Sequence, residues 1–174
     1  MAESTTPVPA SRSSHLKQTP LNDHEGRLIA DWLAGADPDP GRVWKEWGER
    51  SVALLPLGRR FDALRVPAER VHAAVGSEAP KAVAEALVTW LEGPVIRDLR
   101  SPLGPYYVLI PPDAHWDGPE ERLSTHTLLG VPRPGHLSLL TCWVVPPHAP
   151  GALCDPAHLR TLLTLATPLR TVGQ

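Results

Sequence analysis

The stretch that decides the fold is PKAVAEALVTWLEGPVIRDL, residues 80–99, because the spacing of its apolar residues changes within it. Spacings of three and four residues predict an amphipathic helix over 80–93, whose apolar positions are Val83, Ala86, Leu87, Trp90 and Leu91. The Gly93-Pro94 pair ends this helix, since neither residue favours its continuation. The following residues, 94–99, are predicted to form a strand.

Toward the N-terminus, the same reasoning predicts more helices than strands. A helix beginning at Asn22 or Asp23 is ended by the GADPDPG segment, and a second short helix covers RVWKEWGER. Residues 51–58 and 59–67 are predicted to be two strands, and the short link between them predicts a hairpin-like turn. Residues 68–76 are predicted to form another short helix.

Toward the C-terminus, strands dominate until a last helix. Strands are predicted at 105–112, 124–132 and 137–147, and the large apolar residues around Cys142 predict that the last of these is a central strand. A final helix is predicted over 154–167, with Pro156 at its first position. The chain is therefore expected to form an α+β domain, with a mostly antiparallel sheet of about five to six strands packed with helices.

The domain organisation and the compartment follow from composition. Residues 1–20 are rich in Ser, Thr and Pro and are predicted to be a disordered tail, so residues 21–170 form the single expected domain. The chain has 174 residues, a net charge of −2 and two cysteines, which predicts no disulfide framework and no general attraction to nucleic acid. Because it shows no apolar spanning run and no secretory h-region, we expect a cytoplasmic protein with free thiols and no membrane association.

Two groups of residues are candidates for chemistry. The segment CWVVPPHAPGALCDPAHL, residues 142–159, has the pattern C-x5-H-x5-C-x3-H, but its spacing differs from the close ligand pairs of zinc sites. We therefore predict no metal ligand and no cofactor there, and Cys154 is expected to be a structural residue. Arg59 and Arg60 lie on the turn between two predicted strands, where guanidinium groups suit phosphate oxygens, although solvated turn charges are the favoured interpretation.

Residues 44–166 also carry a family resemblance. The motifs WKEWGERSVALLPLGRRFDALRVP, GPVIRD, YYVLIPP and LLGVPRPG resemble those of small actinobacterial proteins of Streptomyces type, which look like degenerate N-terminal domains of bifunctional DNA primase/polymerases. Such polymerases hold two divalent metals with an acidic pair on one strand, followed by an S-x-H motif on a later strand. Here the resemblance implies Asp62 for the pair and Ser124-Thr125-His126 for the later motif, but the residue two positions after Asp62 is Leu64.

One carboxylate is too few to hold two divalent ions, so we expect no polymerase activity and assign no catalytic residue. The function predicted from the sequence is a non-catalytic, cytoplasmic interaction or accessory domain that binds a protein or a nucleic acid. The alternative is a degenerate primase/polymerase-like nucleotide-binding protein that uses Arg59, Arg60, Asp62 and His126.

Overall fold

The central helix predicted from the sequence is present as α4 (Pro80–Leu91) in the computed structural model, which describes residues 22–165. Its buried residues are Val83, Leu87 and Leu91, whereas Trp90, which was also predicted on the apolar face, is 38% exposed. The chain leaves the helix through Glu92 in a left-handed conformation with φ 51°. Gly93 follows because a Cβ there would lie 2.6 Å from the backbone nitrogen of Cys154. The prediction of a disordered tail over 1–20 lies outside the described residues.

Residues 22–165 form five helices and seven strands, which confirms the α+β class. Besides α4, the helices are α1 (Asp23–Ala34), α2 (Pro40–Arg50), α3 (Ala68–Val75) and α5 (Pro156–Leu165). The strands are β1 (Val52–Pro56), β2 (Asp62–Val66), β3 (Val95–Asp98), β4 (Tyr106–Ile110), β5 (Glu121–Leu123), β6 (Leu128–Pro132) and β7 (Thr141–Val145). No helix within this range is long and apolar enough to cross a membrane.

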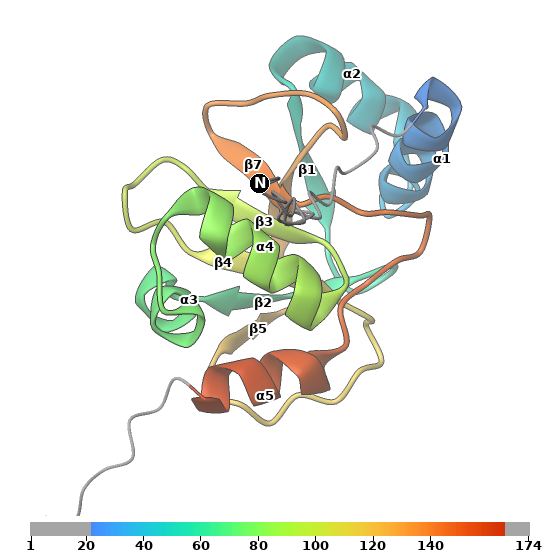
Figure 1. Cartoon of the computed structure of the whole chain (residues 1–174). Coiled ribbons are helices and arrows are strands. Elements are labelled where there is room, and N and C mark those ends of the chain that lie inside the picture. The colour runs from blue at the N-terminus through green and yellow to red at the C-terminus, as the bar shows by residue number, and fades with distance from the viewer. Residues whose placement is uncertain (1–21, 166–174) are drawn as a thin grey trace, which may run out of the picture.

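The strands form two antiparallel sheets, one of five strands in the order β5-β2-β4-β3-β7 and one of two strands, β1 and β6. We refer to the two-stranded sheet as the ribbon. Figure 1 shows α4 in front of the larger sheet with α5 below it, while α1 and α2 lie together beside β1. The larger sheet is thus covered by α3, α4 and α5 on one face and by the ribbon with α1 and α2 on the other.

Alternation along the strands assigns each side chain to one of two cores. In β4, Tyr106, Val108 and Ile110 belong to the core under α3, α4 and α5, whereas Leu109 belongs to the core under the ribbon. The ribbon contributes its inward-facing residues to that second core, namely Ala53, Leu55, Leu129 and Val131. The outward-facing residues of the ribbon alternate with these and are partly or fully exposed, except Pro132, which is buried.

Three local predictions are wrong. The strands at 51–58 and 59–67 do not pair as a hairpin, because β1 pairs with β6 while β2 pairs with β4 and β5. The strand at 137–147, predicted to be central, is the edge strand β7 of the larger sheet. Residues 124–127, predicted to begin a strand, form a turn before β6, and the short strand β5 was not predicted.

Candidate functional site

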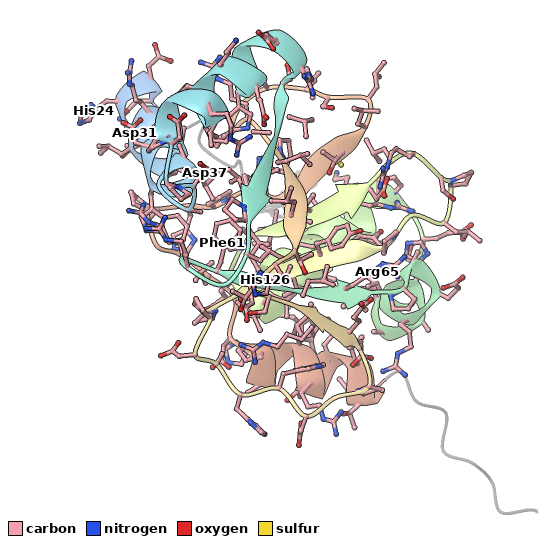
Figure 2. The ribbon with its side chains drawn as sticks, turned by 180° about the vertical axis from the view of Figure 1, so that it is seen from behind. His24, Asp31, Asp37, Phe61, Arg65 and His126 are labelled. Atoms are coloured by element: carbon pink, nitrogen blue, oxygen red, sulfur yellow. The ribbon has the colours of Figure 1, made fainter. Side chains whose placement is uncertain are left out.

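Two turns bring the predicted polar residues into one region. The turn between β1 and β2 contacts the turn between β5 and β6, where the backbone nitrogen of Leu57 donates to the carbonyl oxygen of Thr127 at 3.0 Å. Gly58, with φ 99°, is required there because a Cβ would lie 3.0 Å from the backbone nitrogen of Thr125. In Figure 2, Phe61 and His126 accordingly lie near one another at the end where β2 begins, and Arg65 lies toward its other end.

The carboxylate of Asp62 is buried and its two oxygens are both hydrogen-bonded. The Ser124 hydroxyl donates to Oδ1 at 2.9 Å, and Nε of Arg122 donates to Oδ2 at 2.9 Å. The same guanidinium donates to the carbonyl oxygen of Pro112 at 2.8 Å and to that of Ala114. Asp62 therefore connects β2 to β5 and, through Arg122, fixes the loop that follows β4.

Neither arginine of the turn is a partner of Asp62, whose carboxylate is bound by Arg122 and Ser124. Nη1 of Arg60 donates to the carbonyl oxygen of Trp32 at 2.5 Å, and its guanidinium lies over the Trp32 ring at 5.7 Å from the centroid. Arg59 is exposed, and its charge acts on Asp37.

The pKa of Asp37 lies below its ordinary value. Burial would raise this pKa, but hydrogen bonds from Arg42 and from the backbone of Asp39, and the charges of Arg42 and Arg59, lower it.

His126 is the remaining predicted residue, and it lies exposed on the second turn with φ 68°. The structure thus brings the two turns together, but it directs Arg60 toward α1 and Asp62 into a buried hydrogen-bond network. The four side chains do not converge on one hollow: two are engaged in internal contacts and two face solvent.

The cysteines of the 142–159 segment are free thiols, of which Cys154 is buried and Cys142 is partly buried. Burial raises the pKa of Cys154 to about 12, and its Sγ donates to the carbonyl oxygen of Pro94 at 3.4 Å. Burial also raises the pKa of Cys142, which the charge of Arg97 only partly offsets. Both groups are therefore protonated near neutral pH and are poor nucleophiles. Within residues 22–165, His, Cys, Asp and Glu side chains nowhere gather in a group of three that could hold a metal ion.

A different region is exposed and apolar. Three exposed leucines from the ribbon and from the residue before β7 line one groove, namely Leu54, Leu128 and Leu140. We call these three, together with the exposed leucines Leu99, Leu137 and Leu139 of the adjoining loops, the leucine surface. Leu137 and Leu139 are 95% and 93% exposed, in the loop that leads to Leu140. This loop is held against the β3–β4 loop, since the Leu99 backbone nitrogen donates to the carbonyl oxygen of Leu140 at 3.0 Å.

Three residues of the leucine surface, Leu54, Leu128 and Leu140, line a groove of about 320 Å³ between the two sheets. One wall is the ribbon, with Leu54, Leu128 and Gly130, and the opposite side is the part of the larger sheet that the ribbon leaves uncovered. Tyr107 and Leu123 line that part of the sheet, and Leu140 closes the groove beside Thr141.

The groove carries no net charge. Its two charged lining residues, Asp98 and Arg100, form an ion pair of 2.7 Å. Hydrogen bonds from Arg100 outweigh the effect of burial and lower the pKa of Asp98 below its ordinary value. The carboxylate is therefore ionised near neutral pH and its charge is balanced by the guanidinium. An apolar lining with one internally balanced ion pair suits an uncharged, apolar occupant.

The leucine surface was not predicted from the sequence. Leu137, Leu139 and Leu140 lie within the segment 137–147 that is predicted to be a central strand, but β7 begins only at Thr141. The signal that could have identified them is the segment RPGHLSLL, in which a Pro-Gly pair precedes closely spaced leucines. A Pro-Gly turn followed by leucines is as compatible with an apolar loop as with a strand.

Comparisons of this chain with protein-family models, with curated proteins and with solved structures found no match in any of the three. The resemblance to primase/polymerase-like proteins therefore stays a prediction, and the function is argued below from the residues of this chain.

Proposed function

We propose that this chain is a non-catalytic, cytoplasmic interaction domain that binds a protein partner through the leucine surface. The observation that supports this proposal is a groove lined by three exposed leucines, Leu54, Leu128 and Leu140. Two further exposed leucines, Leu137 and Leu139, lie in the loop that leads to Leu140. Large apolar side chains that are exposed together, and not singly, are typical of interaction sites on proteins.

The energetics favour a partner that covers these side chains. Burying an exposed leucine stabilises an assembly by about 1.5–3 kcal/mol, and Leu137 and Leu139 are almost completely exposed in the isolated chain. A few such residues at the centre of an interface commonly supply most of the binding free energy.

A protein partner is favoured over a nucleic acid by charge. Binding to phosphates requires basic side chains that are free to neutralise them. The one arginine that lines the groove is paired with Asp98, and the whole chain has a net charge of −2. The alternative, nucleotide binding at the two turns, is less well supported because Arg60 and Asp62 are engaged inside the fold.

The cytoplasmic location rests on the thiols. Both cysteines are unpaired, as is usual where glutathione and thioredoxin keep thiols reduced. The proposal that the chain is not an enzyme rests on the raised thiol pKa values and on the internal pairing of Asp62.

The proposed function is tested by comparing exposed leucines on two faces. Leu54 on the leucine surface is 46% exposed and Leu28 on α1 is 45% exposed, so they form a matched pair. A photo-reactive amino acid at position 54 is expected to cross-link a specific partner in cells, and one at position 28 is not. With that partner purified, the double substitution Leu54→Ser/Leu128→Ser is expected to raise Kd by about tenfold or more, whereas Leu28→Ser leaves Kd within about twofold.

Equal cross-linking from positions 28 and 54 would count against a docking function for the leucine surface. So would an unchanged Kd in the double variant, provided that urea unfolding shows the variant to be folded. Because the substituted side chains are exposed, their effect on the free energy of unfolding is expected to be about 0.5 kcal/mol or less.

A further inference from the structure

The register of the ribbon shows which backbone groups face outward. The backbone N–H of Leu57 donates to the carbonyl oxygen of Thr127, and that of Arg133 donates to the carbonyl oxygen of Ser51. These two bonds show that the odd-numbered residues of β6 are the ones hydrogen-bonded to β1. Leu128, Gly130 and Pro132 are the alternate residues of β6, so their backbone groups point away from β1.

The corresponding outward groups of β1 are already satisfied. Leu54 donates its N–H to the carboxylate of Glu46 at 3.0 Å, and its carbonyl oxygen accepts from Arg42 at 2.9 Å. Both side chains come from α2, which therefore covers this edge of the ribbon. Edge strands in stable proteins are commonly protected in this way.

The outer edge of β6 is protected only at one end. The carbonyl oxygen of Pro132 accepts from the indole nitrogen of Trp143 at 2.9 Å. The N–H and C=O groups of Leu128 and Gly130 have no hydrogen-bond partner among residues 22–165. These two residues also line the groove, where Leu128 is 58% exposed.

We propose that the partner supplies an extended peptide segment that adds as a strand to the outer edge of β6 at Leu128–Gly130. This inference rests on the proposed function and specifies its binding mode. The unpaired N–H and C=O groups, two residues apart, match the repeat of a β-strand and not that of a helix. Alternate side chains of the peptide enter the groove, whose apolar lining and balanced charge select uncharged, apolar residues.

The size of the groove favours a peptide over a folded partner or a second copy of this chain. Its walls belong to two different sheets, and a volume of about 320 Å³ suits a few side chains on a narrow segment. An alanine would fit at position 130, because a Cβ there would have only an ordinary contact of 3.5 Å with Val52.

The test uses the full chain and a random library of displayed 12-residue peptides. Selection is expected to enrich peptides with apolar residues at alternate positions.

Gly130→Pro removes the outward N–H without affecting the hydrogen bonds to β1, and Pro132 already occupies the equivalent position two residues on. It is expected to weaken binding of an enriched peptide by about tenfold or more, because a hydrogen bond is lost and the peptide backbone is held away. Gly130→Ala, which keeps the N–H, is the matched control and is expected to stay within about threefold.

A second measurement does not depend on how the variant folds. Alternate N–H groups of a bound strand point to opposite edges, so N-methylation can remove the donors of one edge at a time. Methylation of the N–H groups that face β6 is expected to abolish binding, and methylation of those that face away is expected to leave it unchanged.

Strand addition is overturned if no peptide is enriched, or if neither Gly130→Pro nor either methylation changes the affinity. If Leu54→Ser/Leu128→Ser still abolishes partner binding in that case, the proposed function stands and only the binding mode fails. Sedimentation showing a wild-type dimer that dissociates in Gly130→Pro would assign the edge to a second copy and overturn the peptide proposal.

Discussion

Replacing Asp62 with alanine is expected to lower the free energy of unfolding by about 3–5 kcal/mol. The side chain of Asp62 is 1% exposed and balances the charge of Arg122, whose side chain is only 26% exposed. Without the carboxylate, a largely buried guanidinium and the Ser124 hydroxyl both lose a partner. The residual exposure of Arg122 places the expected loss near the lower end of that range. Urea denaturation at neutral pH measures this loss, provided that the m-value is unchanged.

Asp31→Ala is the matched control for this prediction. Asp31, labelled in Figure 2, makes an exposed ion pair with Arg27 at 4.0 Å, so its loss is expected to cost about 0.5 kcal/mol or less. Two results together would refute the structural role of Asp62. Without metal, Asp62→Ala would have the same free energy of unfolding as the wild type, and Mn²⁺ would stabilise the wild type but not the variant. Those results would assign Asp62 to a metal site and favour the nucleotide-binding alternative.

Replacing Trp47 with alanine is expected to lower the free energy of unfolding by a similar amount, about 3–5 kcal/mol. The Trp47 ring is fully buried between α2 and the ribbon, and it packs edge to face against Trp44 with centroids 5.3 Å apart. Its indole nitrogen donates to the carbonyl oxygen of Val131 in β6 at 3.0 Å. Trp47 therefore connects α2 to the strand that forms one wall of the groove, and we expect its loss to weaken partner binding as well.

Trp90→Ala distinguishes this effect from the general cost of removing a tryptophan. Trp90 lies on α4 and is 38% exposed, so we expect a loss of only about 1 kcal/mol. Thermal or urea unfolding of both variants makes the comparison. Equal losses in Trp47→Ala and Trp90→Ala would contradict the assignment of Trp47 as the contact that fixes the ribbon.

Local patterns predicted the helices well. The spacing of Val83, Leu87 and Leu91 gave the buried face of α4, and Asn22 caps α1 by accepting from the backbone nitrogen of Glu25 at 2.8 Å. Capping, proline positions and apolar spacing act within a few residues, so they can be recognised in the sequence.

Strand pairing could not be predicted in the same way. The link between β1 and β2 contains Gly58 but no Asn-Gly or Asp-Gly pair to fix a two-residue hairpin, and long-range contacts decide the partners. β1 pairs with β6, and β2 with β4 and β5. The apolar residues around Cys142 indicated that the strand is buried on both faces, which does not determine its position in the sheet. Trp143 packs toward the ribbon and Val145 toward the helices, yet β7 is an edge strand.

The candidate site was predicted even less well, for a physical reason. Arg59, Arg60, Asp62 and His126 were selected by residue type, but the direction of a side chain depends on neighbours far away in the sequence. Asp62 is neutralised by Arg122, sixty residues later, and no local pattern indicates this pair. The leucine surface likewise combines Leu54 from the ribbon with Leu140 from a loop.

The most direct test of the central claim is an NMR titration of the ¹⁵N-labelled full chain with a peptide enriched in the selection described above. Binding at the leucine surface predicts that the largest amide shift changes occur at Leu54, Leu128, Gly130 and Leu140, which line the groove. Shift changes centred instead on the turns at 57–62 and 124–127 would contradict that claim, because those turns carry the residues of the nucleotide-binding alternative.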